Sequence, residues 1–116
     1  MINISDEYYK ILTNEFCNNV LLKAIIEALY NNITVVMLED GKTKYFFKIN
    51  DFDSKCDEFE FKLYLTSKNN ERGELFIYES GDNTICVLNY KGKRTLLTSI
   101  IATKSFDDIL EHMLWH

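Results

Sequence analysis

A chain of 116 residues is long enough to bury one hydrophobic core and too short for two, so we expect a single domain over residues 1–116. Its 47% hydrophobic and 14% aromatic content excludes a disordered chain. The net charge of -5, from 18 acidic and 13 basic residues, argues against a general binder of nucleic-acid phosphates, because such proteins neutralise phosphates with Lys and Arg.

The composition also indicates in which cellular compartment the protein is found. The three cysteines, Cys17, Cys56 and Cys86, form no CxxC pair and indicate free thiols in a reducing compartment. Residues 1–7 lack the basic start and apolar stretch of a signal peptide, and no apolar run approaches the length of a membrane span. We therefore expect a cytoplasmic protein with no membrane contact.

Abundant Asn, Lys and Ile with no Pro suggest an A+T-rich genome, such as that of a low-GC bacterium or its phage.

The N-terminal part predicts helix. Ser5 can cap a first turn that carries Asp6 and Glu7, whose charges favour a helix start. Apolar residues then recur at helical spacing on both sides of Asn18 and Asn19. The pattern fits one long bent helix or two short ones, because Asn19 can serve as a second cap.

The next segments predict three strands. Residues 33–38 are apolar on both faces, as in a central strand, and an Asp-Gly turn favours a tight hairpin into residues 43–49. An acidic loop then precedes residues 59–65, where large apolar side chains fall on every second residue. If the second and third strands pair directly, Lys48 could lie opposite Glu60.

Turn residues divide the remaining chain into three more strands at residues 75–79, 84–90 and 94–102. These strands are apolar on both sides, so the sequence does not determine which face is buried. Ser105 then begins a last helix that runs to His116, with Asp108 as its capping carboxylate.

The predicted fold class is α+β: an N-terminal helix (one long or two short), a six-stranded and mainly antiparallel meander sheet, and a short C-terminal helix. A mixed sheet, or a half-barrel wrapped on the long helix, is the alternative. A short C-terminal helix cannot cover the whole second face of the sheet. Either the sheet curls around its own core or an aromatic patch remains for an interface.

The sequence contains no catalytic or cofactor signature. Asp108, His112 and His116 lie at i, i+4 and i+8 and could be metal ligands, but the glutamate of an H-E-x-x-H motif is missing, and a solvated helix face explains the spacing. Cys17 and Cys86 lie on apolar elements and are expected in the core. We expect no enzyme activity, no cofactor and no metal site.

The strongest candidate for a contact surface is the acidic segment 51–60. It fails as a calcium loop, because Lys55 and Cys56 replace a required oxygen ligand and a required glycine. Its carboxylates could instead occupy a basic groove on a partner, although a solvated loop is the ordinary explanation. Together with the aromatic residues expected on the second face of the sheet, the candidate partner-binding residues are Asp51, Asp53, Asp57, Glu58, Glu60, Phe46 and Tyr64.

Two basic stretches are weaker candidates. Lys44, Phe46 and Lys48 interleave charge with an aromatic ring, and residues 91–94 form a basic hairpin tip. Such interleaving occurs in proteins that bind single-stranded nucleic acid. The net charge opposes this, so solvated lysines are the simpler interpretation and no direct nucleic-acid contact is expected.

These features predict a small acidic, non-enzymatic protein that binds another macromolecule as an inhibitor or adaptor. The expected partner is a protein, such as a nucleic-acid-binding protein with a basic groove. A phage protein that blocks a host defence enzyme, of the anti-CRISPR or anti-restriction kind, is one instance. The alternatives are a small-molecule-binding module with an apolar pocket between sheet and helix, and a structural homodimer.

Overall fold

The computed structural model describes residues 2–56, 59–80 and 83–103. That part of the chain forms, in order, α1 (Asp6–Glu15), α2 (Val20–Tyr30), β1 (Val35–Glu39), β2 (Lys44–Cys56), β3 (Phe59–Thr66), β4 (Arg72–Ser80), β5 (Asn83–Tyr90), β6 (Lys93–Leu96) and β7 (Ser99–Thr103). The predicted α+β class and antiparallel sheet are confirmed, but the described strands number seven rather than six. The helix predicted from Ser105 lies outside the described residues.

The N-terminal region forms two short helices. The Ser5 hydroxyl accepts a hydrogen bond from the Tyr8 amide at 3.1 Å and caps α1. The Asn19 side chain accepts one from the Leu22 amide at 3.0 Å and caps α2. Because each helix has its own cap, the two-helix form of the prediction is the correct one.

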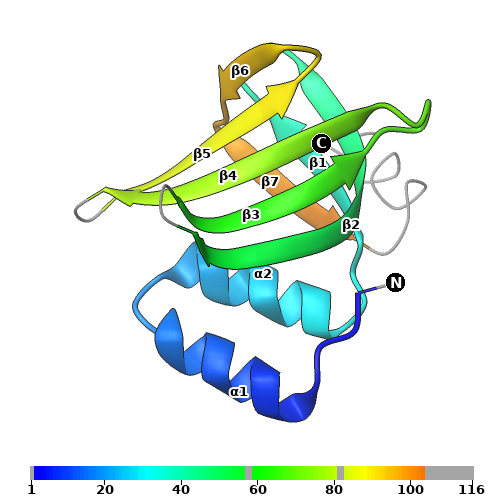
Figure 1. Ribbon diagram of the computed structural model, residues 1–116. Helices are drawn as coiled ribbons and strands as arrows, with labels where there is room; N and C mark the ends of the chain where they lie inside the picture. Colours follow the sequence, from blue (N-terminus) through cyan, green and yellow to red (C-terminus); the bar gives the residue numbers. More distant parts are fainter. Residues whose placement is uncertain (1, 57–58, 81–82, 104–116) are drawn as a thin grey trace.

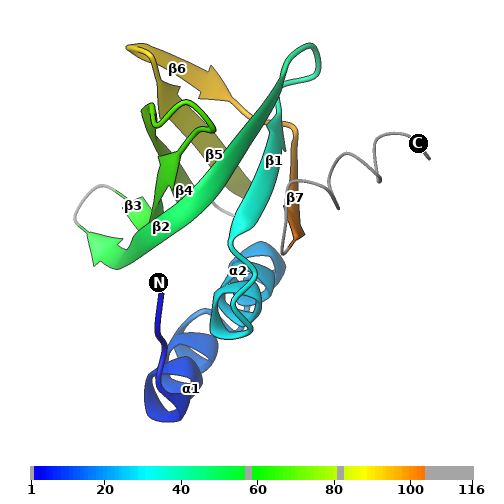
Figure 2. The same cartoon turned by 90° about the vertical axis from the view of Figure 1, so that its right-hand side faces the viewer.

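The seven strands pair antiparallel in the order β6-β5-β4-β3-β2-β1-β7. The prediction of one strand over residues 94–102 is wrong, since β6 pairs with β5 whereas β7 pairs with β1 at the other end of the sheet. The chain changes partner between two consecutive residues: the Leu97 amide donates to Cys86 O at 2.9 Å, and the Thr98 amide donates to Glu39 O at 2.7 Å. The sheet is therefore curled until its two ends meet at this point (Figure 1, Figure 2).

Strand β2 corrects a second prediction, because it continues through the segment expected to be an acidic loop. The register with β3 shifts between Ile49 and Asp51, which places a β-bulge at Asn50. Before the bulge Ile49 points into the core, and after it Phe52 takes the inward position. Asp51 is therefore directed outward. The expected contact between Lys48 and Glu60 is also wrong, since Lys48 pairs with Thr66.

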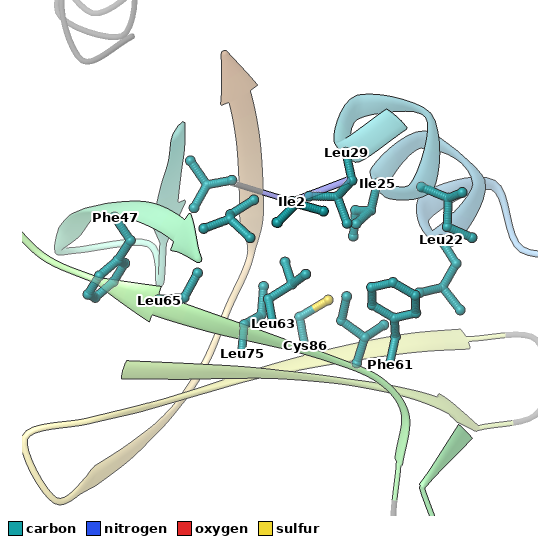
Figure 3. Packing of buried hydrophobic residues seen from close by; sticks show 14 of the residues in the cluster. Ile2, Leu22, Ile25, Leu29, Phe47, Phe61, Leu63, Leu65, Leu75 and Cys86 are labelled. Carbon is teal, nitrogen blue, oxygen red and sulfur yellow. The ribbon is translucent and has the colours of Figure 1, made fainter. Parts of the chain in front are cut away.

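The two helices lie against one end of the curled sheet, with α2 nearer to it than α1 (Figure 1). Four apolar residues of α2 are buried against the inward side chains of the sheet: Leu22, Ile25, Ile26 and Leu29. The inward positions of β2 and β3 that alternation predicted are almost fully buried, and in β4 and β5, where the sequence left the buried face open, the inward residues are Leu75, Ile77 and Leu88. The predicted set is Phe47, Ile49, Phe61, Leu63 and Leu65. Figure 3 shows Phe61, Leu63 and Leu75 of the sheet on the side of the core opposite Leu22, Ile25 and Leu29 of α2.

A second, smaller cluster lies on the opposite side of the sheet. Val35 and Met37 of β1 are buried there, with Phe46 of β2 and Ile101 of β7 packed against them. This explains why the first strand is apolar on both faces. Neither of the described helices has the length and apolar character needed to cross a membrane.

Candidate functional site

The side chains that point away from the core on β2 to β6 form what we call the outer face. Strand pairing aligns them in rows across the sheet. One row contains Asp53, Lys62, Phe76, Val87 and Leu96, and the next contains Asp51, Tyr64, Glu74, Asn89 and Arg94. Charged, aromatic and apolar groups from five strands are thus brought together by register alone.

Lys62 is the centre of this face. Its Nζ lies 2.5 Å from Glu74 Oε2, 4.6 Å from the centroid of the Tyr64 ring and 5.2 Å from that of the Phe76 ring. The hydrogen bond with Glu74 raises the pKa of Lys62, so the ammonium form is retained. The side chain is only 16% exposed, so this charge is held in place rather than free in solvent.

Tyr64 connects this centre to the acidic part of β2. Its hydroxyl donates a hydrogen bond to Asp53 Oδ2. That bond raises the pKa of the Tyr64 phenol, because loss of its proton would place two negative charges side by side. Asp53 and Tyr64, two of the predicted contact residues, therefore belong to one network with Lys62.

Beside the network lies an apolar area, which we call the outer apolar strip: Phe76, Tyr78, Ile85, Val87 and Leu96. The Phe76 and Tyr78 rings stack at 6.3 Å between centroids. Ile85 is 36% exposed and Leu96 63% exposed. Aromatic and aliphatic side chains grouped in this way on a rigid sheet are typical of contact surfaces.

A depression at the edge of the outer face, which we call the polar groove, has a volume of about 710 Å³. It lies where β3 and β4 are joined and where β5 ends. Its lining is rich in hydrogen-bonding side chains: Asn50, Tyr64, Thr66, Arg72, Glu74, Asn89 and Lys91. The side chains of Arg72 and Asn89 make no hydrogen bond, ion pair or ring contact with the described residues.

A second depression of about 690 Å³ lies between the start of α2 and the β4–β5 hairpin. Asn19 is buried at its edge and donates to Glu79 Oε1 at 2.7 Å and to Thr84 Oγ1 at 3.2 Å. Since its carbonyl oxygen also caps α2, the polar atoms of Asn19 are satisfied within the protein. We interpret this contact as structural.

The structure places the predicted contact residues unequally. Asp51 and Asp53 are exposed on the outer face, and Tyr64 lies beside them. Phe46 is instead half-buried against the small cluster of β1 and β7. Asp57 and Glu58 lie outside the described residues, as does the side chain of Glu60.

Lys62 and the outer apolar strip were not among the predicted contact residues. The sequence signal for the strip was the apolar character of both sides of the later strands. Only the pairing shows that Phe76, Val87 and Leu96 share one row.

No group of three potential metal-binding side chains occurs in the part of the chain that the structure describes. Asp108, His112 and His116 lie outside it. Cys86 is buried as predicted, and burial raises its pKa to about 11, which makes it a poor nucleophile. The prediction for Cys17 is wrong: its thiol is exposed, because it lies in the turn between α1 and α2 and not on a buried helix face.

Comparison of the chain with protein-family models, curated proteins and solved structures gives no significant match.

Proposed function

We propose that the chain is a small acidic, non-enzymatic protein that binds another protein through the outer apolar strip and the adjacent carboxylates of Asp51 and Asp53, and that it acts as an inhibitor. The observation that carries this proposal is the contrast between a filled core and an apolar strip on the outside of the same strands. Inhibition requires only a rigid, complementary surface, which a sheet with a packed interior supplies.

The chemistry of the face suggests the kind of partner. Asp51 and Asp53 are exposed at one side of Lys62, and the apolar strip lies at the other. A partner that matches both would have basic side chains next to an apolar patch. A nucleic-acid-processing enzyme with a basic groove has such a surface, and inhibition of a host defence enzyme by a phage protein, of the anti-CRISPR or anti-restriction kind, would be one case.

The alternative of a small molecule in an apolar pocket between sheet and helix has less support. The inward aromatic and aliphatic side chains pack against the helices, and Phe47, Phe61 and Leu63 are at most 1% exposed. The homodimer alternative would place the outer apolar strip against a second copy. The net charge of -5 on each copy opposes that association at low salt, and light scattering would detect it.

Affinity capture from host lysate with two matched variants tests the proposal. Leu96 in the strip and Ile11 on α1 are aliphatic and exposed to similar extents, 63% and 60%. Leu96→Glu should remove a stoichiometric partner that the wild-type protein and Ile11→Glu both retain, and capture should weaken as salt rises because the carboxylates contribute. Equal capture by the two variants, with unchanged melting temperatures, would overturn the role of the strip.

A further inference from the structure

The polar groove has a composition that the partner proposal does not use. Its lining contains several groups that can donate hydrogen bonds, the Arg72 guanidinium, the Lys91 ammonium and the Asn89 amide, while the Asn50 amide already donates to the Thr66 hydroxyl. Tyr64 contributes an aromatic side chain from the outer face, and Leu65, Gly73, Tyr90 and Gly92 complete the lining. A concave site of this volume, with several polar groups in its lining, is of the size that binds small organic molecules.

The charges around the groove favour an anion. Glu74 is neutralised by Lys62 at 2.5 Å. Glu71, beside the groove, accepts a hydrogen bond from the Tyr90 hydroxyl at 3.0 Å and pairs with Lys91 at 3.3 Å. Both carboxylates therefore have cationic partners, whereas Arg72 has none among the described residues. The lining residues carry two cations, Arg72 and Lys91, against one carboxylate, Glu74, although the exposed Asp51 lies in the same row of the outer face. Charges farther from the groove matter less, because salt screens them.

Asn89 supplies a second group that points to a ligand. It is half-buried in the row of Tyr64 and Glu74, and its side-chain amide has no hydrogen-bond partner in the described part of the chain. A guanidinium and an amide that line the same groove can donate together to one oxyanion. Arginine is suited to this because its N–H groups match the oxygens of a carboxylate or phosphate.

We propose that the polar groove binds a small organic anion, with its oxyanion held by Arg72 and Asn89 and its apolar or aromatic part packed on Tyr64. This site is independent of the outer apolar strip. Carboxylate and phosphate share the required chemistry, so a test must present both on an aromatic body and must include the bare ion.

The test is a titration of the isotope-labelled full chain with benzoate, with adenosine 5′-monophosphate and with inorganic phosphate, followed by amide NMR shifts. Either organic anion should give saturable shifts at the amides of Thr66, Gly73 and Gly92, and the tighter of the two identifies the source of the oxyanion. Arg72→Gln should weaken binding about tenfold, as expected for loss of hydrogen bonds to a charged group.

Lys10→Gln, which removes an exposed cation from α1 far from the groove lining, is the matched control and should leave affinity unchanged. The proposal is overturned if neither organic anion saturates at about 10 mM. It is also overturned if inorganic phosphate binds as tightly as the organic anions, or if both variants weaken binding equally.

Discussion

The inward and outward faces of β3 and β4 are made by alternate residues of the same two strands. Inward, Phe61, Leu63 and Ile77 are at most 1% exposed and contact one continuous core. Outward, Lys62 and Glu74 form an ion pair between aromatic rings. The inward face thus contributes most of the stability, while the outward face carries groups whose arrangement matters for binding more than for folding.

The strongest test of this contrast is Phe61→Ala. The Phe61 ring is fully buried, with Phe16 edge-on at 6.0 Å and Phe52 stacked at 5.3 Å between centroids. Its removal should lower the free energy of unfolding by about 3 to 5 kcal/mol, which chemical denaturation measures. Tyr78→Ala on the outward face should cost about 1 kcal/mol. Equal losses would break the comparison.

The reactivity of the two cysteines gives a chemical measure of the difference between a buried and an exposed side chain. Burial raises the pKa of Cys86 from 9.0 to about 11, which lowers its thiolate fraction about a hundredfold at neutral pH. Cys17 is exposed in the turn between the helices. Iodoacetamide should therefore modify Cys17 in the folded protein and Cys86 only after unfolding, as peptide mass spectrometry would show. Rapid modification of Cys86 in the native state would contradict its burial.

A substitution at Asn19 tests the contact between α2 and the β4–β5 hairpin. Asn19→Ala removes the cap of α2 and both hydrogen bonds to β-strand side chains. We expect a loss of about 1 to 3 kcal/mol in thermal or chemical unfolding. Asn18→Ala, at an exposed neighbouring position, is the control and should be nearly neutral. If both substitutions cost the same, the helix end is not fixed by this side chain.

The smallest expected effect is at the β1–β2 turn. Backbone hydrogen bonds from Thr43 and Lys42 lower the pKa of Asp40. Because the folded pKa lies below the unfolded one, the carboxylate stabilises the protein above the unfolded pKa, and this contribution is lost as pH falls through the folded pKa. The melting-temperature difference between wild type and Asp40→Asn should therefore shrink from about pH 6 to about pH 2. A constant difference would show that the charge is not involved.

The alternation of apolar residues in the strands and the capping residues of the helices were sufficient to predict much of the fold. Large side chains on every second residue of β3 predicted that Phe61, Leu63 and Leu65 would be buried, and they are. Ser5 and Asn19 were recognised as potential caps, and both cap helices. These features depend on residues close in sequence, so local patterns carry them.

The errors arose where distant residues decide the structure. The acidic segment looked like a loop, because the bulge at Asn50 reverses the alternation that would have shown a continuous strand. The break at Leu97 and Thr98 depends on Cys86 and Glu39, which supply the carbonyl partners. For the same reason Asp53 and Tyr64 could be proposed from sequence, whereas their connection to Lys62 required the register of β2 with β3.

The change of partner at Leu97 and Thr98 also has a consequence for the order of events during synthesis on the ribosome. Strands β1 to β5 can pair one after another as they emerge, because each hairpin joins neighbours in sequence. β1 must then wait with one edge unpaired until β7 arrives some 60 residues later, at the very end of the described chain. A nascent or truncated chain that stops before residue 93 would expose unpaired edges on both β1 and β5, and we expect it to aggregate where the complete sheet does not.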